Sequence, residues 1–136
     1  MKAHEVLRAA HMIIADGWSQ GANARDAAGV PVQLFTSMDQ ARINPLATRF
    51  SIYGAICKGG SGERWEEPRL MWETLSRRAR ELSGVPGGNN HVHPIMGFNE
   101  MPGQTKEAVL DLLQSAIDEL DPPATKTEYA PHEEAV

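Results

Sequence analysis

The sequence contains little cysteine and no long apolar run. It has a single cysteine among 136 residues, which excludes an internal disulfide. Its apolar stretches are far shorter than the roughly 20 residues that a membrane-spanning helix needs. The N-terminus also lacks the charged and then apolar pattern of a signal peptide. We therefore expect a cytoplasmic protein that has no membrane segment.

Positive charge is scarce as well. The net charge is −5 and the isoelectric point is about 5.5, which argues against a nucleic-acid partner or an anionic membrane surface. Acidic residues are concentrated in residues 118–136, where six of them stand against Lys126 alone. Residues 122–136 also lack an apolar period. We therefore expect one globular domain over residues 1–121, followed by a flexible, acidic, proline-containing tail over residues 122–136.

Apolar residues that recur at intervals of three and four predict four helices. The second helix is expected to begin at Asn44, because asparagine caps helices well and the proline after it suits a first helical turn. The fourth is expected to be capped by Thr105. The predicted helices cover residues 2–16, 44–58, 67–83 and 105–120.

Between the first two helices the sequence predicts a small β-hairpin. Residues 22–25 and 30–35 flank a polar turn that contains Gly29, and the second segment alternates apolar and polar residues. Residues 84–104 are rich in glycine, proline and asparagine and are expected to form a loop. The predicted fold class is therefore mainly α, a compact bundle of about four helices with one small hairpin between helices one and two.

Two histidines, His91 and His93, form the pattern closest to a metal site. In an extended segment their imidazoles would project from the same face, and Glu100 is the nearest carboxylate. A zinc site needs a third and usually a fourth ligand, and no further His or Cys lies within loop distance. We therefore predict no metal and no cofactor. A small metal-assisted hydrolase that uses these three residues is kept as an alternative.

The segment that ends in Asn99 and Glu100 is a second candidate, because it lies just before the last predicted helix. A carboxylate on a loop between elements suits ligand binding or general-base chemistry. The competing interpretation is that both side chains hydrogen-bond to local backbone and position the start of that helix. We favour the structural interpretation, because residues of these types routinely serve turns and helix caps.

Several short motifs follow one another along the chain in a distinctive order. They are Gly17-Trp18-Ser19-Gln20-Gly21, Ala24-Arg25-Asp26, Gly29-x-Pro31-Val32, Ala47-x-Arg49-Phe50-Ser51-Ile52-x-Gly54-Ala55-Ile56 and Phe98-Asn99-Glu100-x-Pro102-Gly103-x-Thr105. This order resembles that of an uncharacterised family of small bacterial and phage proteins, domain of unknown function six-one-nine-seven. In the family pattern, Phe50-Ser51 is usually Trp-Cys and Phe98-Asn99-Glu100 is usually Trp-Asn-Asp. The resemblance covers about residues 3–120, and it implies a phage-related or mobile-element setting rather than a reaction.

These features lead us to expect a non-catalytic binding or accessory protein whose partner is a protein or a small ligand. We expect its functional surface where three parts of the chain converge. These are the turn that contains Trp18, which we call the Trp18 turn, the region of Arg49, and the loop over residues 91–100 that holds His93. Trp18 would supply an apolar wall and Arg49 a contact for an anion, while Asn99 and Glu100 would orient the ligand by hydrogen bonds. The alternative from a different class is an assembly protein that forms an oligomer through its acidic tail.

Overall fold

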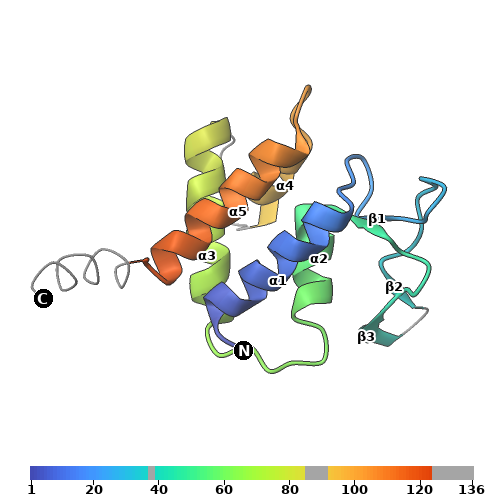
Figure 1. Ribbon diagram of the computed structural model, residues 1–136, viewed down its shortest axis with the longest axis horizontal. Coiled ribbons are helices and arrows are strands. Elements are labelled where there is room, and N and C mark those ends of the chain that lie inside the picture. Colours follow the sequence, from blue (N-terminus) through green and yellow to red (C-terminus); the bar gives the residue numbers. More distant parts are fainter. Residues whose placement is uncertain (37–38, 85–91, 124–136) are drawn as a thin grey trace, which may run out of the picture.

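The computed structural model describes residues 1–36, 39–84 and 92–123 of the chain. Within these residues lie five helices and two small antiparallel sheets of two strands each (Figure 1). The fold is thus mostly helical, as predicted, although a fifth helix is present. The predicted tail falls outside the described residues from residue 124 onward. The helices are α1 (Ala3–Asp16), α2 (Ile52–Gly59), α3 (Pro68–Ser83), α4 (Val92–Asn99) and α5 (Lys106–Leu120).

Three of the predicted helices agree with the structure to within one residue at each end. The side chain of Thr105 accepts a hydrogen bond from the backbone N–H of Ala108 at 3.1 Å and so caps α5. Gly84 ends α3 with a φ of 73°, a left-handed conformation that glycine adopts without a steric penalty. Local chemistry at the helix ends is therefore enough to locate α1, α3 and α5.

The prediction that the second helix begins at Asn44 is wrong. The chain first forms strand β4 (Arg49–Phe50), which pairs antiparallel with β1 (Ala24–Arg25). Ser51 then caps α2, because its Oγ accepts a hydrogen bond from the backbone N–H of Gly54 at 3.1 Å. The start of α2 is thus decided by a strand partner from another part of the chain, which helical periodicity cannot detect.

The hairpin predicted between the first two helices is present only in part. Its turn forms, since Asp26 Oδ1 accepts hydrogen bonds from two backbone N–H groups of the turn, and Arg25 makes an isolated antiparallel bridge to Pro31. However, β1 takes β4 as its strand partner. A separate hairpin follows, made of β2 (Phe35–Thr36) and β3 (Asp39–Ile43).

The prediction that residues 84–104 form a loop is also wrong, because they contain α4. The proline of this helix, Pro94, lies in its first turn, where a missing N–H breaks no helical hydrogen bond. Ile95 and Phe98 are buried, and α4 packs against α3 (Figure 1). A helix of eight residues spans little more than two turns, so its apolar period is too short to stand out in the sequence.

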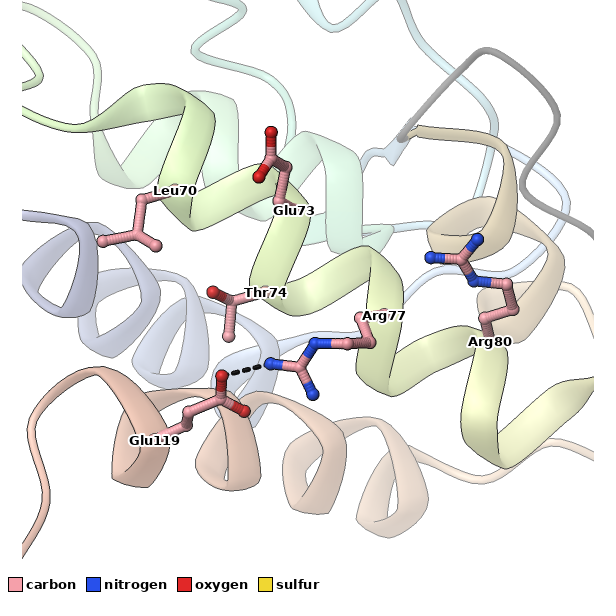
Figure 2. Close-up of a pocket in the computed structure, with 6 residues that line it drawn as sticks. All are labelled: Leu70, Glu73, Thr74, Arg77, Arg80 and Glu119. Atoms are coloured by element: carbon pink, nitrogen blue, oxygen red, sulfur yellow. Dashed lines mark hydrogen bonds and ion pairs between the residues drawn. The ribbon is translucent and has the colours of Figure 1, made fainter.

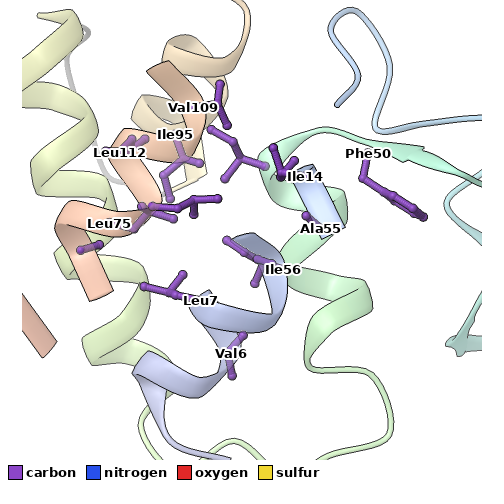
Figure 3. Packing of buried hydrophobic residues seen from close by; sticks show 14 of the residues in the cluster. Val6, Leu7, Ile14, Phe50, Ala55, Ile56, Leu75, Ile95, Val109 and Leu112 are labelled. Atoms are coloured by element: carbon purple, nitrogen blue, oxygen red, sulfur yellow. The ribbon is translucent and has the colours of Figure 1, made fainter. Parts of the chain in front are cut away.

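The hydrophobic core lies where the five helices meet, and α4 contributes Ile95 and Phe98 to it (Figure 3). α1 packs on both α2 and α5, and α5 packs on α3. Full burial of a leucine or isoleucine side chain contributes about 1.5–3 kcal/mol, so this cluster stabilises the bundle far more than helix propensity does. Across the described ranges, the helices are too short or too polar to cross a bilayer. The core includes Leu7, Ile14, Ile56, Leu75, Ile95 and Leu112.

Candidate functional site

Asn99, at the end of α4, is fully buried and joins three parts of the fold. Its Oδ1 accepts hydrogen bonds from Trp18 Nε1 at 2.9 Å and from the backbone N–H of Ile52 at 3.1 Å. Its Nδ2 donates to the backbone carbonyl of Ser19 at 3.1 Å and to Glu100 Oε2 at 2.7 Å. Both lone pairs and both N–H groups of the amide are therefore occupied within the protein. Asn99 is a joint between the Trp18 turn, the start of α2 and the end of α4.

Glu100 follows directly and its side chain is exposed. Its Oε1 accepts a hydrogen bond from the backbone N–H of Gly21 at 2.8 Å, and its Oε2 accepts the one from Asn99. Both donors are neutral. Among the residues that the structure describes, Glu100 forms no ion pair. Its carboxylate is therefore oriented from two sides while its charge is not neutralised by a neighbouring cation.

The turn that faces Glu100 is held close to α2 and to the chain after α4. Gln20 Nε2 donates to the backbone carbonyls of Asn99, at 3.2 Å, and of Met101, at 2.9 Å. On the α2 side, a Cβ at Gly54 would lie 2.4 Å from the carbonyl oxygen of Asn23. A side chain at that position would push the turn away from the helix, so the glycine is what permits this close approach.

These elements enclose a hollow of about 300 Å³ on the surface, which we call the Glu100 hollow. Its lining combines the acidic Glu100, the apolar Met96 and the exposed, polar Asn23. Asn23 Oδ1 accepts a hydrogen bond from Ser51 Oγ at 2.8 Å, while its Nδ2 has no acceptor in the described part of the chain. The hollow is lined by Gly21, Ala22, Asn23, Met96 and Glu100.

Arg25, which is not among the predicted site residues, is the cation that supports the turn. Its Nη2 donates to the carbonyl of Gln20 at 2.9 Å and its Nη1 to that of Gly29 at 2.9 Å. Its Nε donates to Ser19 Oγ at 3.2 Å. Ser19 and Gln20 lie in the motif Gly17-Trp18-Ser19-Gln20-Gly21, and Arg25 lies in the motif Ala24-Arg25-Asp26. The polar residues of these motifs are the sequence signal that could have identified them.

The predicted site residues come together only in part. Trp18, Asn99 and Glu100 lie in one hydrogen-bonded network, as described above. Arg49 is exposed on β4 and turns toward Gly29, whose added Cβ would lie 3.6 Å from Arg49 Nη1. Arg49 makes no hydrogen bond to Asn99 or Glu100 in the described chain.

His93 is exposed near the start of α4, seven residues before Glu100. That separation corresponds to about 10 Å along a helix axis, too far for the two side chains to share one ion without a further rearrangement. His91 lies outside the described residues. Within the ranges that are described, no group of three His, Cys, Asp or Glu residues is placed to hold a metal ion.

A larger hollow, of about 400 Å³, lies between α3 and α5 (Figure 2). Glu119 accepts hydrogen bonds there from Arg77 and, at 2.8 Å, from Arg78 Nε, while Glu73 pairs with Arg69 at 2.6 Å. Burial raises the pKa of Glu119, but the hydrogen bonds and charges of the two arginines outweigh it and hold the pKa below its usual 4.5. The carboxylates of this hollow are therefore already paired. It is lined by Leu70, Glu73, Thr74, Arg77, Arg80 and Glu119.

Comparison with known proteins identifies a family and no individual relative. No curated protein matches the chain, and neither does any solved structure. The model of the family described as "Family of unknown function (DUF6197)" matches residues 1–119, a span that includes Trp18, Asn99, Glu100 and the whole lining of the Glu100 hollow. The chain belongs to this family of unknown function.

Proposed function

We propose that the protein is a non-catalytic binding protein that holds a protein partner against the Glu100 hollow. The observation that carries the proposal is the state of Glu100, an exposed carboxylate oriented by Gly21 and by the buried Asn99, with no ion pair in the described chain. A group that is already ordered before binding loses little conformational entropy when a partner arrives. This preorganisation supports a binding role.

The surroundings of Glu100 favour binding over catalysis. An acid–base pair or an activated nucleophile would place a second titratable or nucleophilic side chain within hydrogen-bond reach of Glu100. The groups that contact the Glu100 carboxylate are the backbone N–H of Gly21 and the amide of Asn99, and neither of them titrates at ordinary pH. We place this binding in the cytoplasm and, as the family resemblance implies, in a phage-related or mobile-element setting.

Photo-crosslinking in the cells that produce the protein tests this proposal. The photoreactive residue p-benzoylphenylalanine would replace Ala22, which lines the hollow, and in a matched control Ala28, which is exposed on the neighbouring turn. We expect a discrete crosslinked species from Ala22 and not from Ala28, with the partner identified by mass spectrometry. Circular dichroism first establishes that both variants are folded. The same crosslinking pattern at both positions would contradict the proposal.

A further inference from the structure

The charge and the walls of the Glu100 hollow indicate what kind of group it takes. We propose, on the basis of the function proposed above, that the hollow receives a cationic side chain of the partner, the alkyl-ammonium of a lysine or the guanidinium of an arginine. The juxtaposition that carries this inference is the Glu100 carboxylate, which forms no ion pair with a described residue, in one lining with the apolar Met96 and with Asn23, whose Nδ2 has no acceptor in the described ranges.

The carboxylate supplies the charge. Each Glu100 oxygen accepts one hydrogen bond from a neutral donor, so each keeps a lone pair for a further donor. Hydrogen bonds in which both groups are ionised are shorter and stronger than neutral ones. An incoming ammonium or guanidinium would therefore gain more from this carboxylate than a neutral amide or hydroxyl would.

The apolar residues that line the Glu100 hollow suit the methylene groups of a lysine or arginine side chain. Lysine and arginine carry their charge on a run of methylene groups that packs on apolar surface while the charged end stays in contact with polar groups. Met96 and Ala22 provide that surface, and a thioether adapts its shape readily. Asn23 Nδ2 can donate to the backbone carbonyl of the residue that bears the cation.

An anionic ligand fits the hollow poorly. The guanidinium of Arg25 lies near Gly21, but it donates to Ser19, Gln20 and Gly29 and is occupied in holding the turn. An anion in the hollow would meet the Glu100 carboxylate directly, whereas Arg25 is not among the lining residues and directs three of its five N–H groups to the turn. Contact with the lining therefore favours a cation over an anion.

Amide NMR spectra of the full chain, titrated with small probes, test the inference directly. The probes are n-butylammonium and methylguanidinium, with n-butanol and butyrate as neutral and anionic counterparts. We expect the two cations to shift the amide signals of Gly21, Ala22 and Glu100, and the counterparts to leave them in place. Equal shifts from butanol, or larger shifts from butyrate, would overturn the inference.

Two variants and one control make the test specific. Glu100→Gln should weaken cation binding by about tenfold, a factor that corresponds to the loss of one charge-assisted contact. Glu63→Gln removes an exposed carboxylate from the loop between α2 and α3 and should leave binding unchanged. Met96→Ala keeps the carboxylate and should weaken butylammonium more than methylguanidinium, which has a shorter stem. Equal weakening by the two glutamine variants would overturn the inference.

The crosslinking and NMR results together distinguish cation recognition by the hollow from the proposed binding function on which it rests. An Ala22-specific crosslink to a protein, without any shift from the cations, would leave the binding function standing and refute cation recognition. Spermidine, a free polyamine, is the last probe to be titrated into the protein and followed by NMR. Saturation of the hollow by spermidine at micromolar concentration, without an Ala22-specific crosslink, would assign the site to a small cation and refute the protein partner.

Discussion

Glu100 and Glu119 are both carboxylates near the end of a helix, yet their surroundings are opposite. Glu119, in the last turn of α5, accepts a hydrogen bond from the guanidinium group of Arg77 (Figure 2) and another from that of Arg78. Glu100, just after α4, accepts its hydrogen bonds from a backbone N–H and from the neutral amide of Asn99. At Glu119 the charge is neutralised inside the fold, where it links α3 to α5. At Glu100 the carboxylate is oriented but its charge stays available.

The difference shows that a carboxylate's role follows from its donors and not from its position on a helix. In the larger hollow, the carboxylates of Glu73 and Glu119 are both paired with arginines, and the ion pairs of Glu119 join two helices. In the smaller hollow, the Glu100 carboxylate forms no ion pair with a described residue and is held in place by the buried Asn99. The second arrangement is the one that suits recognition of another molecule, because a ligand does not have to compete with an internal partner.

The largest expected effect concerns the support beneath Glu100. Asn99→Ala would leave two groups without their acceptor, the half-buried indole N–H of Trp18 and the buried backbone N–H of Ile52. Because each buried unsatisfied polar group costs about 1–3 kcal/mol, we expect the free energy of unfolding to fall by about 3 kcal/mol or more. Urea unfolding measures this change in the free energy of unfolding. Asn44→Ala, in a more exposed turn, is the control and should lose about 1 kcal/mol. Equal losses in the two variants would refute the role assigned to Asn99.

The next effect concerns Glu100 itself. Glu100→Gln keeps one acceptor oxygen, so its new NH₂ group must face either the Gly21 N–H or the Nδ2 of Asn99, both of which are donors. We expect a loss of about 1 kcal/mol in the free energy of unfolding. Urea unfolding at low and at high salt should give the same loss, because no ion pair is removed. A loss that disappears at high salt would mean that Glu100 has a cationic partner inside the fold.

The smallest effect concerns Glu119. Glu119→Gln removes the charge of an exposed ion pair and should lower the free energy of unfolding by about 0.5 kcal/mol at low salt, and by less at high salt. Because the folded-state pKa lies below 4.5, the stabilisation is present above that value and is lost as the pH falls through the folded-state pKa. Thermal unfolding from neutral to acid pH should therefore show the wild-type and variant stabilities converging below pH 4.5. A difference that stays constant through that range would contradict the pairing.

Several parts of the molecule could be predicted because their causes are local. The apolar stripes of α1, α3 and α5 repeat over three or more turns, and the capping residues Thr105 and Gly84 lie at the ends they specify. The hypothesis that Trp18, Asn99 and Glu100 meet was drawn from short motifs, and the structure does bring these residues into one network.

The errors have one physical cause, because each concerns a contact between distant parts of the chain. α2 begins late because Phe50 pairs with Ala24, and α4 is a helix because its short apolar face packs against α3. Arg49 turns to the Gly29 side because neighbouring residues on a strand point in opposite directions and Phe50 is the buried one. A hydrophobic period or a short sequence motif does not identify contacts between residues that are far apart in the chain.

The sequence by itself determined the mainly helical class, three of the helices and the family, because periodicity and capping act over a few neighbouring residues. Only the tertiary structure decided that Asn99 is a buried joint and that Glu100 is an exposed carboxylate with no ion pair among the described residues. Those two roles depend on donors from Trp18 and Gly21, about 80 residues away in the chain. The fold creates this site because burial and hydrogen bonding act between groups that are close in space, whatever their separation in sequence.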